Sequence, residues 1–181
     1  MSRYFAFLRA INVGVHTVKM DALRQIFESL GFAGVETFIA SGNVIFEAGL
    51  QDAVALENTI ENRLREALGY EVSTFIRTDP ELAAIAHYQP FQQSDPDAAA
   101  TLNIAFLAAP LDPVSRQKLM ALRTEIDDFN VHRCEIYWLC RKKQSESTFS
   151  NAVLEKALGR KATLRGVSTV KKMAEKYLQP E

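Results

Sequence analysis

The chain has 181 residues, 48% of them hydrophobic and 24% charged, which is enough apolar material for a core that needs neither metals nor disulfides. Its 21 basic and 22 acidic residues give a net charge of −1, whereas a dedicated nucleic-acid-binding protein usually carries a basic excess. Two cysteines, no long uncharged apolar run and no signal-peptide pattern together predict a cytoplasmic protein without a membrane partner.

The first part of the chain predicts strand, helix, strand, strand, helix and strand, in that order. The predicted strands span residues 3–11, 35–40, 43–47 and 71–77, and the predicted helices span 21–30 and 52–68. Thr78 and Glu81 form a predicted capping box for a short helix that follows the last strand and runs to Tyr88.

The same order of elements begins again after residues 89–99, a segment without periodicity. The second set of predicted strands spans 102–109, 129–131, 135–141 and 161–165, with helices over 113–126 and 151–158 and a last helix that ends at Tyr177. This order is that of the ferredoxin-like unit. The sequence therefore predicts an α+β fold of two ferredoxin-like βαββαβ halves, each followed by a short helix: residues 1–88, a linker over 89–100, and residues 101–181.

Topology predicts that two distant segments of the first half meet at one edge of its sheet. With right-handed crossovers, the loop after the first strand and the hairpin between the second and third strands lie at the same end, beside the start of the first helix. Unpaired N–H groups and the helix dipole favour an anion there, by about 0.3–1 kcal/mol per charge. The predicted ligand-binding residues are Arg9, Asn12, Gly14, Lys19, Ser41, Gly42 and Asn43. The alternative is ordinary turn chemistry, and Asp21 in the first helical turn would repel an anion.

A secondary candidate anion site precedes the helix predicted over 151–158. A basic run, Arg141 to Lys143, is followed there by a serine-rich stretch. The candidate residues are Ser150, Asn151 and, on the last helix, Lys171. A solvated loop and a solvated helix face are the alternatives for these residues, because runs of charge more often face water than a ligand.

No motif for metal, cofactor or covalent chemistry stands out in the sequence. The three histidines fall on different predicted elements without metal-ligand spacing, and no phosphate loop, dinucleotide fingerprint or nucleophile elbow follows a strand. Cys134 and Cys140 are predicted to pack as small apolar residues rather than to form a redox pair. We therefore predict no metal, no cofactor and no identifiable catalytic residue.

The first strand carries Phe5, Phe7 and Arg9 on one face, an arrangement similar to an RNA-recognition platform. The basic and aromatic signature expected on the third strand of such a platform is missing, because that strand has the sequence Asn-Val-Ile-Phe-Glu over residues 43–47. Packing of this apolar face inside the protein is the favoured alternative.

Five segments of the chain resemble the signatures of the bacterial family called domain of unknown function 1697. They are residues 8–14, 18–24 and 39–46 in the first half, and residues 151–159 and 169–173 in the second. The resemblance implies a cytosolic α+β protein of two ferredoxin-like halves and brings no established activity. Val15 stands where members commonly have Gly, and Thr148 where they commonly have Lys, and both departures would weaken a ligand site of the family.

Three functions remain open at this point. The first is a module, with or without catalysis, that binds a small anionic ligand such as a phosphate, a carboxylate or a nucleotide at the edge of the first half. The second is a non-enzymatic interaction module that forms a homo-oligomer. The third is RNA binding, which the charge balance disfavours.

Overall fold

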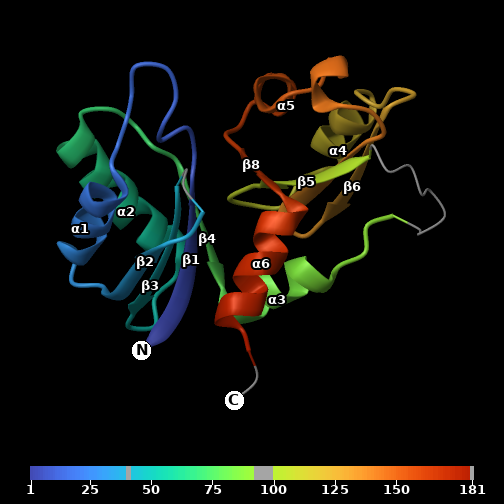
Figure 1. The fold of residues 1–181 in the computed structure, drawn as a ribbon. Coiled ribbons are helices and arrows are strands. Elements are labelled where there is room, and N and C mark those ends of the chain that lie inside the picture. The colour runs from blue at the N-terminus through green and yellow to red at the C-terminus, as the bar shows by residue number, and fades with distance from the viewer. Residues whose placement is uncertain (40–41, 92–99, 180–181) are drawn as a thin grey trace. The chain divides into compact units, whose positions relative to one another are not determined.

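Two four-stranded antiparallel sheets, each packed with helices, form the protein (Figure 1). The computed structural model describes residues 1–39, 42–91 and 100–179. The chain divides into two compact units: residues 1–85 with the C-terminal residues from 173 onward, and residues 86–172. The predicted α+β fold with a repeated βαββαβ order is confirmed. The predicted domain limits stay a prediction, and most of the predicted linker lies outside the described residues.

The first unit has the strand order β2-β3-β1-β4, and every neighbouring pair of strands is antiparallel. Its elements are β1 (Ser2–Leu8), α1 (Met20–Glu28), β2 (Ala33–Thr37), β3 (Asn43–Ala48), α2 (Ala53–Leu68) and β4 (Thr74–Thr78), followed by α3 (Asp79–His87). In this order each connection that contains a helix passes over one strand, as in the ferredoxin-like unit. The apolar stripes of α1 and α2 pack on the same face of the sheet and form the core with Tyr4, Ala6 and Leu8 of β1.

The second unit repeats this order of strands as β6-β7-β5-β8. Its elements are β5 (Thr101–Phe106), α4 (Pro113–Met120), β6 (Asp127–His132), β7 (Glu135–Cys140), the 3-10 helix η1 (Gln144–Glu146), α5 (Asn151–Leu158) and β8 (Thr163–Gly166). Helix α6 (Val167–Tyr177) begins in this unit, and its residues from 173 onward belong to the first. The core of this unit lies between the helices and one face of the sheet, around Trp138, Phe149 and Leu154.

Helix α4 is shorter than the sequence predicts, because it ends at Met120 and not at Ile126. The spacing of Leu122 and Ile126 continues the helical period, but the hydroxyl oxygen of Thr124 accepts hydrogen bonds from the N–H groups of Ile126 and Asp127, at 3.2 and 3.0 Å. A side chain that bonds the nearby backbone in this way competes with the helix. The predicted helix end was therefore wrong, and β6 starts earlier than predicted.

Strand β1 also ends earlier than predicted, at Leu8 instead of residue 11. Ala10 adopts a left-handed backbone conformation with φ of 52°, which an extended strand does not accommodate. Arg9 therefore lies in the loop after the strand and not on its face, and its side chain is half-buried. Its backbone N–H donates to the carbonyl oxygen of Ser73 at 2.9 Å.

Phe5 and Phe7, on the face of the first sheet that is turned away from α1 and α2, have no exposed surface. The end of α6 belongs to the same unit, and the ring of Tyr177 lies edge-on to Phe5, with their centroids 5.9 Å apart. The Tyr177 hydroxyl donates to Glu36 on β2 at 2.7 Å, which fixes the chain's C-terminal residues on this sheet. Buried rings cannot stack on bases, so packing explains the aromatic face.

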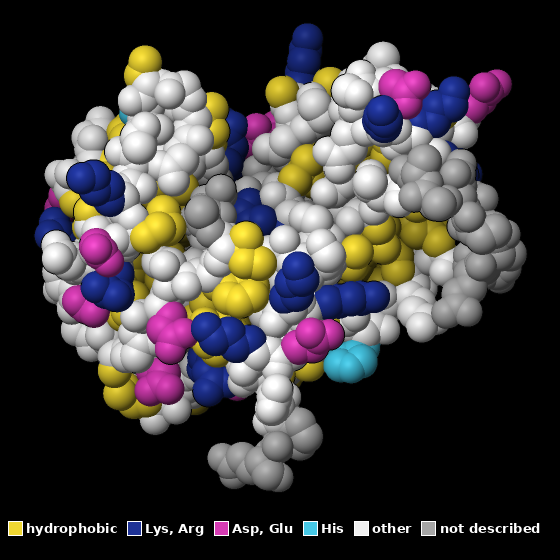
Figure 2. All heavy atoms as spheres, in the orientation of Figure 1, with side chains coloured by type: hydrophobic (Ala, Val, Ile, Leu, Met, Phe, Trp, Pro, Cys, Tyr) yellow, Lys and Arg dark blue, Asp and Glu magenta, His cyan; other side chains and the backbone are white. Residues whose placement is uncertain are grey.

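The surface carries both signs of charge. On the face that Figure 2 shows, basic side chains lie among acidic and uncharged ones and do not form one continuous basic surface. None of the helices in the described part of the chain has the length and apolar character of a membrane span.

Candidate functional site

Three connections of the first unit meet at one end of its sheet: the β1–α1 loop, the β2–β3 hairpin and the α2–β4 loop. The N–H of Leu8 donates to the carbonyl oxygen of Gly42 at 2.8 Å, so the hairpin lies against the end of β1. The Tyr70 hydroxyl donates to the carbonyl oxygen of Ile11 at 3.1 Å, which ties the third loop to the first. We call this end of the sheet the rim. Segments about thirty residues apart are thus neighbours there.

Gly42 is required for the close approach of the hairpin to β1. Its φ is +87°, and a Cβ atom at this position would lie 3.0 Å from Cγ2 of Ile11 and 3.0 Å from Cβ of Leu8. Both the left-handed backbone and the narrow space exclude a side chain. Gly42 therefore shapes the rim, and this role needs no ligand.

Asn43 is buried at the start of β3, with 2% of its surface exposed. Its amide nitrogen donates to the carbonyl oxygens of Phe38 and Ile39, at 3.0 and 3.2 Å. The amide nitrogen of Asn43 thus braces the hairpin. We therefore do not expect Asn43, which was predicted to bind a ligand, to contact one. Ser41, which was predicted beside it, lies outside the described residues.

Asn12 lies at the mouth of the β1–α1 loop and is exposed. Its side-chain oxygen accepts a hydrogen bond of 2.6 Å from the N–H of Val18, which closes the loop just before α1 begins. No described residue accepts a hydrogen bond from the amide nitrogen of Asn12. The loop also packs against the third connection, because the ring of His16 stacks on Tyr70 with their centroids 3.8 Å apart.

Helix α1 begins at the rim without a side-chain cap. Its N-cap residue is Lys19, which is exposed and whose side chain forms no capping hydrogen bond with the first turn. Helices α2, α4 and α5, in contrast, are capped by Asp52, Asp112 and Ser150. The N–H groups of the first turn of α1 therefore lack a side-chain cap from the N-cap residue, which is itself a cation.

Two further features of the rim bear on its access to a ligand. Asp21, in the first turn of α1, forms an ion pair with Arg24 at 3.2 Å, so its charge is partly balanced. Gly14, at the loop tip, has a φ of +63° and no atom within 4 Å of the place where a Cβ would stand. Val15 beside it is 94% exposed. The loop tip thus leaves room for a ligand or for a partner protein.

The secondary candidate residues serve local structure where the structure describes them. The Ser150 hydroxyl accepts from the N–H of Val153 at 3.2 Å and caps α5. The amide nitrogen of Asn151 donates to the carbonyl oxygen of Ala162 at 2.9 Å. Lys171 is exposed on α6, and no described contact joins it to the start of α5.

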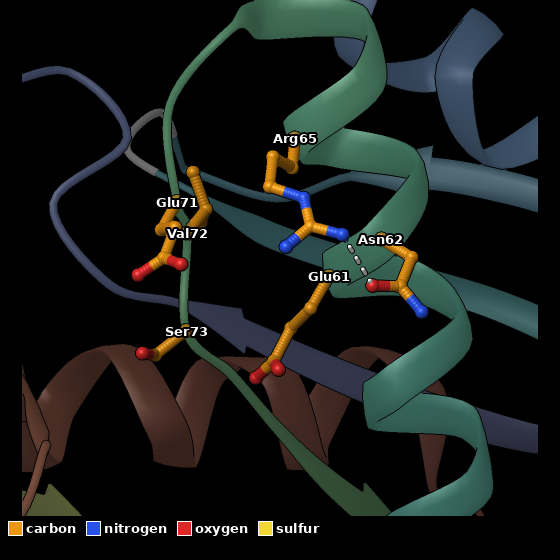
Figure 3. Close-up of a pocket in the computed structure, with 6 residues that line it drawn as sticks. All are labelled: Glu61, Asn62, Arg65, Glu71, Val72 and Ser73. Atoms are coloured by element: carbon orange, nitrogen blue, oxygen red, sulfur yellow. Dashed lines mark hydrogen bonds between the residues drawn. The ribbon is translucent and has the colours of Figure 1, made fainter.

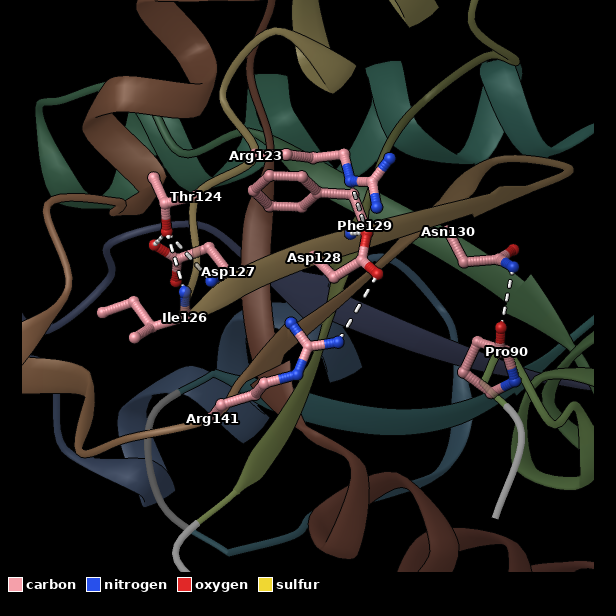
Figure 4. A network of polar contacts seen from close by, with 9 residues as sticks. All are labelled: Pro90, Arg123, Thr124, Ile126, Asp127, Asp128, Phe129, Asn130 and Arg141. Atoms are coloured by element: carbon pink, nitrogen blue, oxygen red, sulfur yellow. Dashed lines mark hydrogen bonds and ion pairs between the residues drawn. The ribbon is translucent and has the colours of Figure 1, made fainter. Parts of the chain in front are cut away.

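Asp127, at the start of β6, is the centre of a polar network that the sequence did not reveal. It is 1% exposed, and its carboxylate accepts hydrogen bonds from the indole N–H of Trp138 and the hydroxyl groups of Ser147 and Thr124, at 2.8–2.9 Å. Figure 4 shows the contact with Thr124. The network fixes the loop before α5 to the sheet.

The next residue, Asp128, lies between two arginines. Its carboxylate is 2.9 Å from Arg123 and 3.8 Å from Arg141 (Figure 4). Arg141 belongs to the basic run that precedes the secondary candidate anion site. Since this arginine already faces a carboxylate, the basic run offers less free positive charge than its sequence suggests.

Helix α2 supplies two carboxylates to the outer edge of β4. The side chains of Glu57 and Glu61 accept hydrogen bonds from the N–H groups of Ile76 and Thr74, at 3.0 and 2.9 Å. An edge strand exposes such N–H groups, and pairing them blunts the edge. The pKa of Glu57 is raised: burial is the largest cause, the charges of Glu61 and Asp52 add to it, and the hydrogen bond from Ile76 and the charge of Arg77 oppose it.

The raised pKa of Glu57 predicts a pH effect on stability. Because the folded protein binds this proton more tightly, the group stabilises the fold most below its ordinary pKa of 4.5, and the contribution is lost as the pH rises through the raised pKa. Glu57→Gln keeps an acceptor for the N–H of Ile76 but does not titrate. Its stability relative to the wild type should therefore be highest at neutral pH and fall on acidification, as measured by chemical denaturation. Glu66→Gln, exposed on the same helix, should change less; a relative stability of Glu57→Gln that rises on acidification would contradict the assignment.

The fold is that of an α+β protein with two ferredoxin-like sheets, and polar loops form the rim of the first sheet. The model of the family described as "Protein of unknown function (DUF1697)" matches residues 1–137, more than half of the chain, and the chain belongs to this family. The predicted family membership is thus confirmed. The segments at 151–159 and 169–173 lie beyond the matched residues.

The chain is also similar to a solved structure, the conserved bacterial protein SP0830 from Streptococcus pneumoniae. The TM-score is 0.79 and the sequence identity is 23%, over 99% of each chain. At this identity the likeness shows the fold alone. No curated protein matches the chain. In the described part of the chain, no group of three or more His, Cys, Asp or Glu side chains is placed to hold a metal ion.

Proposed function

We propose that the protein binds a small anionic ligand at the rim of its first unit, where α1 begins. The ligand would be a phosphate, a carboxylate or the phosphate end of a nucleotide. The observation that carries the proposal is the hydrogen bond from Val18 to the side-chain oxygen of Asn12, because it holds the amide nitrogen of Asn12 next to the uncapped start of α1. The predicted set of contacts is thereby narrowed to Asn12, Lys19 and the first turn of the helix.

The chemistry of these groups suits an anion. The N–H groups of the first helical turn and the amide of Asn12 donate hydrogen bonds, and Lys19 adds a positive charge. A helix N-terminus contributes about 0.3–1 kcal/mol per ligand charge at an exposed site. The ion pair of Asp21 with Arg24 reduces the repulsion that this carboxylate would exert. We therefore expect Lys19 to be a main contributor to binding.

Lys19→Ala should weaken the binding of inorganic phosphate about fivefold, because one charge contact at an exposed helix terminus contributes about 1 kcal/mol. The melting temperature should not change, since the side chain of Lys19 is exposed and does not cap the helix, and alanine keeps the backbone carbonyl that accepts from Leu23. The isotope-labelled protein is titrated with phosphate, and the changes in its amide chemical shifts give both the affinity and the location of binding.

A matched control is Lys118→Ala, which removes an exposed lysine from α4 in the second unit. It should leave phosphate binding unchanged. If phosphate shifts no amide between residues 12 and 22, or if both lysine variants lose the same affinity, the rim is not the binding site.

A further inference from the structure

A hollow of about 150 Å³ lies between the C-terminal half of α2 and the segment that leads into β4 (Figure 3). It is lined by Glu61, Asn62, Arg65, Glu71, Val72 and Ser73. All these residues belong to the first unit, and the hollow is distinct from the start of α1 where the anion is proposed to bind. The anion site proposed at the start of α1 therefore does not account for the polar residues that line this hollow.

The polar groups around the hollow are only partly paired with one another. Glu61 uses Oε1 to accept from the N–H of Thr74 at 2.9 Å, and no described residue donates to its Oε2. The guanidinium of Arg65 donates to the side-chain oxygen of Asn62 at 3.2 Å and forms no ion pair with Glu61 or Glu71. Figure 3 shows Glu61 and Arg65 reaching from the helix and Glu71 from the opposite wall. Two carboxylates and one guanidinium thus share the hollow without neutralising each other.

The charge of Glu71 acts on Glu61 across this space. Burial raises the pKa of Glu61, the hydrogen bond from Thr74 lowers it, and the negative charge of Glu71 raises it again. A cation between the two glutamates would attract both carboxylates and offset the repulsion between them, because an opposite charge favours the ionised form of a carboxylate. The guanidinium, in turn, is a natural partner for a carboxylate or a similar planar anion.

We propose that this hollow binds a small zwitterion of the α-amino-acid type. Its ammonium group lies between Glu61 and Glu71, and its carboxylate pairs with the guanidinium of Arg65. The Ser73 hydroxyl supplies one further hydrogen bond at the wall of the hollow. Both signs of charge in one small cavity distinguish this site from a surface that would attract any cation.

The test is a titration of the full-length, isotope-labelled protein with L-alanine. Saturable shifts are expected in the amides of residues 61–74. Glu71→Gln and Arg65→Gln should each weaken binding about tenfold, because each removes one charge-assisted contact of the ligand. Both residues are exposed, so neither substitution should unfold the protein. Glu66→Gln, which removes an exposed charge from the same helix, should bind as the wild type does.

Ethylamine and propionate, which carry only the positive or only the negative charge, should each bind about tenfold more weakly than L-alanine. Three outcomes would overturn the proposal. They are no saturable shift in the wild type up to about 100 mM, well above a millimolar dissociation constant; equal binding by the wild type and the Glu71 and Arg65 variants; and ethylamine binding as tightly as L-alanine. The phosphate titration of the Lys19 variant is independent of all three outcomes.

Discussion

Asp127→Ala should lower the free energy of unfolding of the second unit by about 3 kcal/mol, because it leaves the buried indole N–H of Trp138 without an acceptor and removes the hydrogen bonds that hold Ser147 and Thr124. Three side chains, those of Trp138, Ser147 and Thr124, lose their hydrogen-bond partner at once. Trp138 is the single tryptophan of the chain, so its fluorescence during urea denaturation follows the unfolding of this unit directly.

Asp128→Ala is the matched control, since it removes the same group one residue further along β6. The two arginines that pair with Asp128 are one-third exposed or more, and such ion pairs contribute about 0–1 kcal/mol. If both alanine variants lose the same stability, the buried network is not what fixes the loop to the sheet. Asp127→Asn, which keeps one acceptor oxygen, should lie between the wild type and Asp127→Ala.

Gly42→Ala should destabilise the first unit by about 2–4 kcal/mol, the sum of the left-handed backbone cost and of crowding against β1. The new Cβ atom would lie 3.0 Å from Ile11 and Leu8 and 3.2 Å from the backbone oxygen of Leu8, and backbone cannot move aside as a flexible side chain does. Thermal unfolding followed by circular dichroism measures the loss. Amide hydrogen exchange of β1 and β3 should locate it.

Gly14→Ala separates these two causes. Gly14 also has a positive φ, of +63°, but nothing lies within 4 Å of its would-be Cβ. Only the backbone term of about 1 kcal/mol should remain. Equal losses at both glycines would mean that the close contact between the hairpin and the end of β1 contributes nothing measurable to stability.

Elements whose signals are local were well predicted. The helices predicted over 52–68 and 151–158 are α2 and α5; Asp52 and Ser150 cap them, and Gly69 and Gly159 end them with positive φ. Thr78 bonds reciprocally with Glu81 at the start of α3, as the capping box required. Each of these interactions joins residues only three or four positions apart, which is why the sequence reveals them.

The errors at element ends have a different cause. The apolar period continues through Ile126, but α4 stops at Met120. The hydroxyl oxygen of Thr124 accepts from the backbone of a turn there, and the residues that follow form β6. The period of β1 likewise continues past Leu8, but Ala10 turns the chain away. A pattern of apolar residues records which side chains are buried, and it does not record where the backbone changes direction.

The role of Asn43 also could not be inferred from its neighbours in the sequence. A Ser-Gly-Asn turn suggests an exposed donor, yet the amide is buried and bonds two carbonyl oxygens of its own hairpin. Likewise, the hollow between α2 and β4 joins Glu61 and Glu71 only because the chain turns back after Gly69. Residue type predicts what a side chain can do, but the packing around it decides which of those bonds it makes.

The order of residues alone predicted the duplicated α+β architecture and the capping box before α3, because hydrophobic period and capping act over a few residues along the chain, and its signature segments predicted the family. The tertiary structure decided which polar groups at the rim bond within the protein and which are left for the proposed ligand. Folding gives Asp127 and Asn43 their hydrogen-bond partners and places Gly42 in close contact with β1. Asn12 and Lys19, in contrast, lie at a helix start that no side chain caps. Long-range hydrogen bonds and steric contacts leave no periodic trace in a sequence, and for that reason only the folded chain separates a binding group from a brace.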